Sequence, residues 1–273
     1  MNSRQRFLET MRFASPDRVP CFQEGLRDDV LEKWQSQGLP AGVQLDQIFD
    51  FDLREEFSPH LYSRLDPVEL AGSPSGLDRW RRSLDPNDSR RLPSSWKKSV
   101  PLWQERQHVL MIQVHDGFFE TMGIGDSRSF TRLLYLVADQ PEFVRQAMAI
   151  HGEFTARVVQ RLLSQVQVDA AVFSEPIAGN HGPLISPNMY AHLVLPAYQP
   201  ILEVLKSCEV ETIILRTYAN ARALLPVIFS QGFNCLWAVE TEPQAMDYRL
   251  IRQAIGGQLR LIGGIDVDVL RQG

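Results

Sequence analysis

VLMIQVH at residues 109–115 and DAAVFS at residues 169–174 are short runs of almost entirely apolar side chains, and ETIIL at 211–215 is a third. Continuous apolar runs of this length predict strands that are buried on both faces of a sheet. The segments between the runs, near 127–137 and 141–165, have apolar residues at helical spacing. Strands that alternate with helices predict a parallel sheet assembled from right-handed βαβ units.

The alternation continues toward both ends of the chain. Further strands are expected at 19–22, 47–53, 234–239 and 259–262, and further helices at 3–14, 27–36, 187–207, 220–230 and 246–255. Ser186 before Pro187 predicts a helix start, and Gly232 and Gly256 predict helix ends. No glycine-rich phosphate-binding motif follows any of these strands. We therefore favour a (β/α)8 TIM barrel over a doubly wound nucleotide-binding sheet.

Residues 54–104 depart from this pattern, because they are rich in Arg, Ser, Asp and Pro. We expect an excursion of loops or a small hairpin there, within a single barrel domain that spans residues 1–273. The basic residues of the excursion are interleaved with acidic ones. Such mixed charge favours a solvated surface over a nucleic-acid-binding patch.

Composition excludes several classes of protein. The 273 residues match the size of one barrel, 44% of them are hydrophobic, and the net charge is -5, which argues against a nucleic-acid binder. The three cysteines are far apart and form no CxxC pair, which favours a reducing compartment. The first residues lack the apolar run of a signal peptide, and no apolar stretch is long enough to span a membrane. We expect a cytoplasmic protein with no membrane contact.

In a (β/α)8 barrel the active site lies at the carboxyl ends of the strands, and this rule selects candidate residues without a motif. The residues expected there are Glu24, Arg27, Asp50, Asp52, His115, Asp116, Glu175, His181, Arg216, Tyr218, Asn220, Glu240, Glu242 and Asp266. Eight of them are carboxylates, which repel one another unless they are protonated, paired or metal-bound. A cationic group or an oxygen-liganded metal at the carboxyl ends of the strands would compensate this repulsion.

Two of these residues carry the strongest functional signal. Glu175 and Arg216 each end an apolar strand, which is a costly place for a charge without a role. The alternative for this pair is a structural ion pair. His115 and His181 have the alternative of being ordinary hydrogen-bonding loop residues, and Tyr218 that of closing the top of the barrel.

Four blocks of the sequence, in order, resemble the uroporphyrinogen decarboxylase superfamily, which also contains corrinoid-dependent methyltransferases. They are RQRFLETMRFASPDRVP (4–20), GIGDSRSFTRLLYLVADQPEFVRQAM (123–148), VDAAVFSEPIAGNHGPLISPNMYAHLVLPAYQPILEVLK (168–206) and GFNCLWAVETEPQAMDYRLIRQAIGGQLRLIGGIDVDVL (232–270). The resemblance covers nearly the whole chain and implies a barrel of the uroporphyrinogen decarboxylase type. It also implies a small-molecule substrate and allows a corrinoid protein as partner.

Two departures indicate an outlying branch of the superfamily, closer to its uncharacterised, corrinoid-methyltransferase-like branches than to the decarboxylase itself. The family's arginine-rich loop after the first strand is replaced by FQEGLRDDV (22–30), with Arg27 as its one arginine. A highly anionic tetrapyrrole would meet too few cations there. The zinc-binding His-x-Cys pair of the methyltransferases is replaced by LRTYAN (215–220), which argues against zinc with nitrogen and sulfur ligands, and no residue is assigned as a metal ligand.

Three functions follow from the resemblance as hypotheses. The first is methyl transfer that involves a corrinoid partner, with Glu175 or Glu240 as general acid or base and Arg216 as an anchor for an anionic group. In this hypothesis the substrate-binding residues are Glu24, Arg27, Asp52, His115, His181, Tyr218, Asn220 and Asp266. The second hypothesis is decarboxylation of a tetrapyrrole side chain, which needs no cofactor. The third is a ligand-binding barrel without catalysis.

The end of the sequence suggests an incomplete barrel. Seven strands are expected before the chain ends, and Asp266 in the family's G-G-I-D segment is followed by seven residues. We therefore expect the eighth βα unit to be missing. An open barrel exposes strand edges, which favours self-association into a homo-oligomer.

Overall fold

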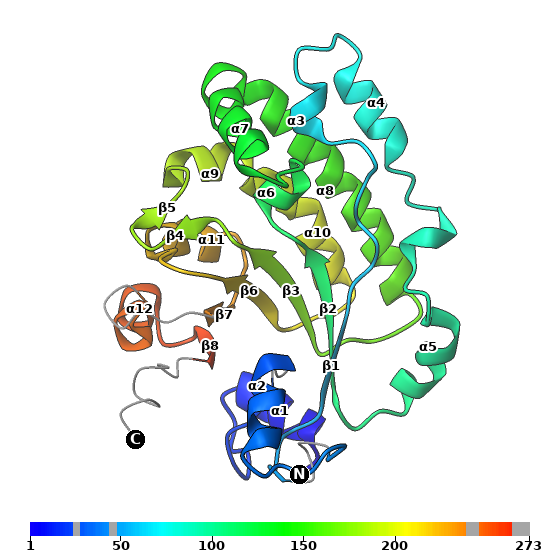
Figure 1. The fold of residues 1–273 in the computed structure, drawn as a ribbon, viewed down its shortest axis with the longest axis vertical. Helices are drawn as coiled ribbons and strands as arrows, with labels where there is room; N and C mark the ends of the chain where they lie inside the picture. Colours follow the sequence, from blue (N-terminus) through cyan, green and yellow to red (C-terminus); the bar gives the residue numbers. More distant parts are fainter. Residues whose placement is uncertain (24–27, 44–47, 239–245, 264–273) are drawn as a thin grey trace.

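A computed structural model describes residues 1–23, 28–43, 48–238 and 246–263 (Figure 1). Its centre is a six-stranded, wholly parallel sheet in the order β1-β2-β3-β6-β7-β8. The strands are β1 (Arg54–Phe57), β2 (Val109–His115), β3 (Ala170–Glu175), β6 (Ile213–Thr217), β7 (Cys235–Ala238) and β8 (Arg260–Gly263). The expected α/β class and the parallel sheet are therefore confirmed.

Helical segments connect each strand to the next. The helices are α1 (Ser3–Met11), α2 (Asp28–Ser36), α3 (Pro67–Leu70), α4 (Gly76–Ser83), α5 (Trp96–Gln104), α6 (Phe118–Thr121), α7 (Ser127–Asp139), α8 (Pro141–Leu163), α9 (Pro187–Leu193), α10 (Leu195–Ser207), α11 (Leu225–Phe229) and α12 (Tyr248–Ile255). Two 3-10 turns, η2 (Ser89–Arg91) and η3 (Arg222–Leu224), and a small hairpin of β4 (Ala178–Gly179) and β5 (Gly182–Pro183) complete the described elements. No helix within the described ranges is long and apolar enough to span a bilayer.

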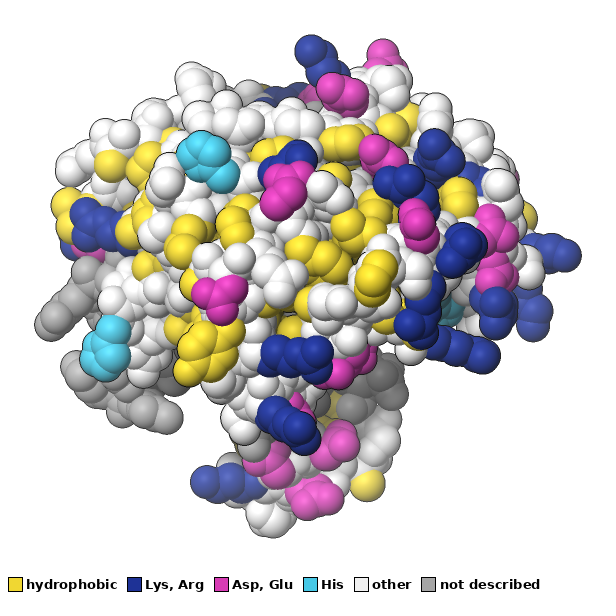
Figure 2. Space-filling model, turned by 90° about the horizontal axis from the view of Figure 1, so that it is seen from above, with side chains coloured by type: hydrophobic (Ala, Val, Ile, Leu, Met, Phe, Trp, Pro, Cys, Tyr) yellow, Lys and Arg dark blue, Asp and Glu magenta, His cyan; other side chains and the backbone are white. Residues whose placement is uncertain are grey.

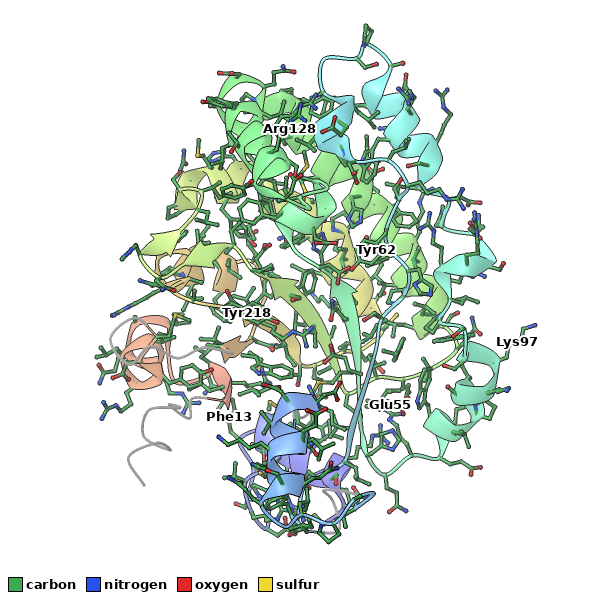
Figure 3. All side chains as sticks on the ribbon, viewed as in Figure 1. Phe13, Glu55, Tyr62, Lys97, Arg128 and Tyr218 are labelled. Carbon is green, nitrogen blue, oxygen red and sulfur yellow. The ribbon has the colours of Figure 1, made fainter. Side chains whose placement is uncertain are left out.

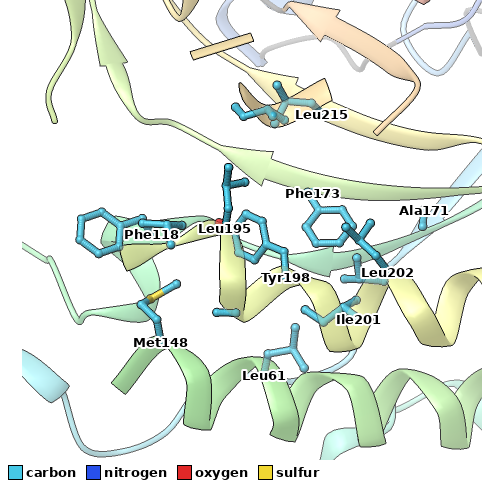
Figure 4. Close-up of a cluster of buried hydrophobic side chains, with 14 of the residues drawn as sticks. Leu61, Phe118, Met148, Ala171, Phe173, Leu195, Tyr198, Ile201, Leu202 and Leu215 are labelled. Carbon is cyan, nitrogen blue, oxygen red and sulfur yellow. The ribbon is translucent and has the colours of Figure 1, made fainter. Parts of the chain in front are cut away.

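The two faces of the sheet carry separate apolar cores. One face packs against the helices that connect the strands, chiefly α8 and α10, and Figure 4 shows Phe173 and Tyr198 in this helix-covered layer. On the opposite face, Phe7 and Met11 of α1 cover Met111 and other strand residues. We call this second surface the inner face. It is the face that would line the interior if the sheet closed into a barrel.

The predicted helix boundaries are partly confirmed. The Ser186 side chain caps α9 by accepting from the backbone N–H of Met189 at 3.2 Å, and Pro187 occupies the first turn, as expected. Gly256 ends α12 at φ +130°, a conformation that favours glycine. The expected single helix 187–207 is two helices, because the chain departs from helical geometry at Val194 before α10 begins.

The prediction of strands at 19–22 and 47–53 is wrong. Residues 19–22 and the described residues 48–53 form no strand, and the sheet begins at Arg54. Pro20 has no N–H to give a ladder, and one backbone bond joins the two segments, from Asp52 N to Cys21 O at 2.7 Å. Side chains take the other groups: the Leu53 N–H donates to Ser3 Oγ, and the Cys21 N–H donates to the Asp52 carboxylate.

The expected excursion at 54–104 is also corrected. The segment supplies strand β1 and then helices α3, α4 and α5 before the chain enters β2. Its tryptophans explain why it folds: Trp80, Trp96 and Trp103 are all buried, and Trp103 stacks on Phe57 of β1 with 4.7 Å between ring centroids. The Arg, Ser and Pro content suggested loops, but the buried tryptophans anchor the segment to the core as helices.

Helices α8 and α10 touch at a glycine, which gives a first prediction. A Cβ built on Gly152 of α8 would lie 2.0 Å from the backbone oxygen of Ala197 in α10. Because that neighbour is backbone, Gly152→Ala must separate the helices, and we expect a loss of about 1–3 kcal/mol of unfolding free energy in urea. Gly257→Ala is the control, since a Cβ there meets nothing within 4 Å. Equal stability of the two variants would contradict the close contact.

Candidate functional site

Polar side chains replace apolar ones on the inner face toward the carboxyl ends of the strands. Arg216 of β6 donates from Nη1 to Glu56 of β1, at 2.9 Å to Oε1 and 3.1 Å to Oε2. Its Nη2 donates to the side-chain oxygen of Gln113 in β2. Three strands thus contribute to one hydrogen-bonded cluster, and period-two alternation places each of its members on the same face.

An indole lies against this cluster. The Arg216 guanidinium carbon is 5.3 Å from the centroid of the Trp237 ring in β7, and the Arg54 guanidinium carbon is 4.8 Å from it. Arg54 also lies 3.4 Å from Glu56. Guanidinium groups are attracted to the π face of an indole. Glu56 and Trp237 therefore hold two cations on the inner face, Arg216 near the carboxyl end of β6 and Arg54 at the amino end of β1.

One hydrogen-bond donor of Arg216 has no acceptor among the described residues. The Arg216 Nε atom is buried and has no hydrogen-bond partner there, while both Nη atoms are occupied. A buried guanidinium N–H without an acceptor costs free energy. An acceptor placed at Nε would remove this cost, while Nε is shielded from solvent and the guanidinium charge is paired with Glu56.

The cluster leads to a cavity at the end of β2. The Gln113 side-chain amide donates to Asp116, and Asp116 lines a cavity of about 290 Å³ together with Tyr62, Asp66 and Glu120. Leu61, Leu65, Trp80 and Ile124 supply its apolar wall. Apolar walls with a few polar groups are typical of small-molecule sites.

Burial raises the pKa of several acidic groups that line this cavity, so it disfavours their negatively charged forms. Desolvation, and then the repulsion of Glu69, raises the pKa of Asp66. Desolvation, followed by the repulsion of Asp116, also raises the pKa of Glu120. The pKa of the Tyr62 hydroxyl is raised by the same two causes. A carboxyl group with a raised pKa is a better proton donor near neutral pH than an exposed one.

Glu175 ends β3 as expected but lies on the helix-covered face. It pairs in register with Thr217, whereas Ser174 pairs with Arg216. Its carboxylate is 1% exposed and accepts from Phe118 N, from the Tyr190 hydroxyl and from the Tyr198 hydroxyl. Burial raises its pKa. The alternative considered for these two residues, an ion pair between Glu175 and Arg216, is therefore not found, and Glu175 does not face the polar cluster.

A bulge turns His115 to the same helix-covered face. The register between β2 and β3 shifts between Gln113 and His115, so that His115 pairs with Phe173. Its ring is fully buried, 4.5 Å from the Tyr198 ring and 5.3 Å from the His151 ring, measured between centroids. An extra residue in a strand reverses the side that later residues face, so His115 faces away from Gln113 and is not at the polar cluster where it was expected as a substrate-binding residue.

The remaining predicted residues lie in several places. Asp52 is buried at the amino end of β1, bound by Arg6 and Arg18, so it is a structural ion-pair partner remote from the carboxyl ends. His181 and Asn220 lie near the β4–β5 hairpin, where His181 is exposed and the Asn220 N–H donates to Gly179 O. Tyr218 directly follows β6 (Figure 3). Glu24, Arg27, Glu240, Glu242 and Asp266 lie outside the described residues.

Four members of the cluster were not predicted from the sequence: Arg54, Glu56, Gln113 and Trp237. Arg54 and Glu56 fell in the supposed excursion, so their alternation on one face of a strand went unnoticed. Gln113 and Trp237 each lie within an apolar run. A polar residue or a large aromatic ring inside such a run indicates a position on the face that lines a site, and this pattern could have predicted both.

No three His, Cys, Asp or Glu side chains in the described ranges are arranged to hold a metal ion. At the end of β6, residues 215–220 offer a guanidinium, two hydroxyls and an amide, with no imidazole or thiol. No model of a known protein family matches the sequence, and a search of curated proteins gives no match.

Proposed function

We propose that the chain is a (β/α)8-barrel enzyme of the uroporphyrinogen decarboxylase superfamily, which transfers a methyl group between a small anionic substrate and a corrinoid carried by a partner protein. The four sequence blocks that resemble the superfamily support this assignment. The strand order supports a barrel, because the strands follow one another in sequence order without the reversal of a doubly wound sheet.

The observation that carries the proposal is the position of Arg216 at the carboxyl end of β6. Glu56, Gln113 and Trp237 fix its guanidinium, and its buried Nε has no acceptor among the described residues. Arg216 binds and orients the anionic group of the substrate. The corrinoid, when bound with its carrier, supplies a centre that accepts or donates the methyl group.

We assign proton transfer to Asp116 rather than to Glu175. Asp116 lines the cavity and is joined to Arg216 through Gln113, whereas Glu175 is sealed under helices. A thiol or amine substrate becomes a better methyl acceptor when it loses its proton, and a carboxylate within reach can accept that proton. Glu240 remains a second candidate from the sequence.

Substitution of Arg216 tests the anchor. In a turnover assay with methyl donors and a corrinoid protein, Arg216→Ala should lower kcat/KM at least tenfold, mainly through KM, because a charge-assisted hydrogen bond contributes about 1.5–3 kcal/mol. Arg216→Lys should retain part of the activity, since it keeps the charge without the planar fork. Arg222→Ala, an exposed neighbour in η3, is the control. Wild-type kinetics in the Arg216→Ala variant would contradict the assignment of Arg216 as the anchor for the anionic group.

Decarboxylation of a tetrapyrrole carboxylate is the second candidate. The paired Arg54 and Arg216 guanidiniums over Trp237 favour it, because two cations can receive a carboxylate-bearing side chain. Conversion of uroporphyrinogen to coproporphyrinogen would decide for this reaction. Binding of either ligand class without turnover would instead support a barrel that only binds.

A further inference from the structure

Folding separates the charges that the sequence interleaves between residues 54 and 104. This segment contains nine Lys and Arg residues and seven Asp and Glu residues. An open groove of about 970 Å³, which we call the basic groove, runs along it between His60 and Lys98. Five of the nine cations line the groove, Arg64, Arg90, Arg91, Lys97 and Lys98, but only one of the seven carboxylates, Asp88.

That single carboxylate is already neutralised. Arg90 donates to both oxygens of Asp88, with Nε 3.1 Å from Oδ1 and Nη2 2.6 Å from Oδ2. Of the five cations lining the groove, four remain after this pairing. The groove therefore carries positive charge on a chain whose net charge is -5.

The floor of the basic groove holds a buried cation. Arg91 is 8% exposed, and its guanidinium donates to the backbone oxygens of His60, Tyr62, Ser83 and Asp85. In the part of the chain that the structure describes, no carboxylate oxygen lies within 4.0 Å of it. Carbonyl oxygens solvate the guanidinium without cancelling its charge, so a positive potential reaches the groove.

Helix α5 adds to this potential. Its amino end opens on the groove, and its first turn contains Lys97 and Lys98 but no acidic residue. The amino end of a helix carries a partial positive charge, so cations there are unfavourable and a nearby anion is stabilised. Figure 2 shows Lys and Arg side chains gathered at the side of the molecule where α4 and α5 lie in Figure 1.

We propose that the basic groove docks an acidic segment of a partner protein. The groove is open, and its cations are mainly exposed, which suits electrostatic steering of a macromolecule better than enclosure of a small ligand. Leu92, Pro93 and the exposed ring of Tyr62 offer apolar contact beside the charges. An acidic peptide segment is favoured over nucleic acid, because the overall charge is negative and the cations are confined to one segment.

Binding of a labelled Glu-rich peptide, followed by fluorescence anisotropy, tests the docking surface. The double variant Lys97→Glu with Lys98→Glu should weaken binding at least tenfold, and the affinity of the wild type should fall as salt rises to about 0.15 M. This variant should fold, since it places acidic residues in the first turn of α5. Arg128→Glu with Arg157→Glu is the matched control, with the same change in charge at exposed positions away from the groove; Figure 3 shows Lys97 and Arg128 far apart.

The control variant should bind within about twofold of the wild type. Absence of peptide binding, or equal weakening by the two double variants, would overturn the proposal, because the charge of the groove would then have no special role. Tighter binding of a single-stranded oligonucleotide with the same number of charges would also overturn it, and would assign the groove to nucleic acid.

Discussion

An Asp169→Ala variant is expected to lose about 3–5 kcal/mol of unfolding free energy, which is a large fraction of the stability of a typical domain. Asp169 immediately precedes β3, and its carboxylate is buried. It accepts from Arg4 Nε at 2.8 Å, from Arg106 Nη2 at 3.1 Å and from the Leu110 N–H at 2.9 Å. Arg106 is itself buried, so removal of the carboxylate leaves a desolvated cation and an unsatisfied backbone donor.

Urea denaturation of the wild type and the variant measures this loss. Asp139→Ala is a suitable control because Asp139 is exposed at the end of α7, and it should change the stability by less than about 0.5 kcal/mol. Asp169→Asn should have an intermediate effect, since its side-chain oxygen can still accept one hydrogen bond while the charge is lost. A loss below about 1 kcal/mol in Asp169→Ala would show that Arg106 finds other partners.

The elements predicted correctly from the sequence are those whose burial is uniform. β2, β3, β6 and β7 are continuous apolar runs buried on both faces, and helix α8 has a regular apolar stripe. The errors fall where local hydrogen bonding overrides the pattern. Residues 47–53 alternate apolar and acidic side chains like a strand, yet Asp52 is bound by Arg6, Arg18 and the Cys21 N–H.

The candidate site was predicted less well than the fold, and the reason is which way each side chain faces. Arg216 lies near the end of a strand, as expected, and the structure places it on the inner face. Its neighbour across the sheet, Glu175, is one residue later in register and therefore faces the opposite side. The partner that Arg216 has instead, Glu56, is 160 residues away in the sequence, and no local pattern indicates such a contact.

Below neutral pH the protein should lose stability steeply, because two buried histidines resist protonation in the folded state. Desolvation lowers the pKa of His115 well below its usual value, and lowers that of His151 to about 4. In the unfolded chain both histidines titrate near pH 6.5. The unfolded state thus binds more protons below that pH, and stability falls by up to about 1.4 kcal/mol per pH unit for each histidine.

The surroundings of the two rings explain the shift. The Gly117 N–H donates to His115 Nδ1 at 2.9 Å, which places the ring proton on Nε2, where no partner is found among the described residues. His151 Nε2 lies 3.4 Å from Leu61 O, a contact that favours protonation, but desolvation outweighs it and the nearby charge of Arg91 lowers the pKa further. Glu175, on the neighbouring strand, acts in the opposite direction, since its raised pKa lets the folded state take up a proton above the usual carboxyl range.

Comparison with His115→Asn isolates the histidine contribution. The asparagine oxygen can replace Nδ1 as the acceptor for Gly117, and the side chain cannot titrate. Unfolding free energies measured from about pH 7 to about pH 5 should then show a slope that is smaller by up to about 1.4 kcal/mol per pH unit than in the wild type. His181→Asn, at an exposed position, should leave the slope unchanged. If His115→Asn kept the wild-type slope, His115 would have to gain its proton while folded, which requires water or an anion to reach Nε2 through the layer formed by Phe173 and Tyr198.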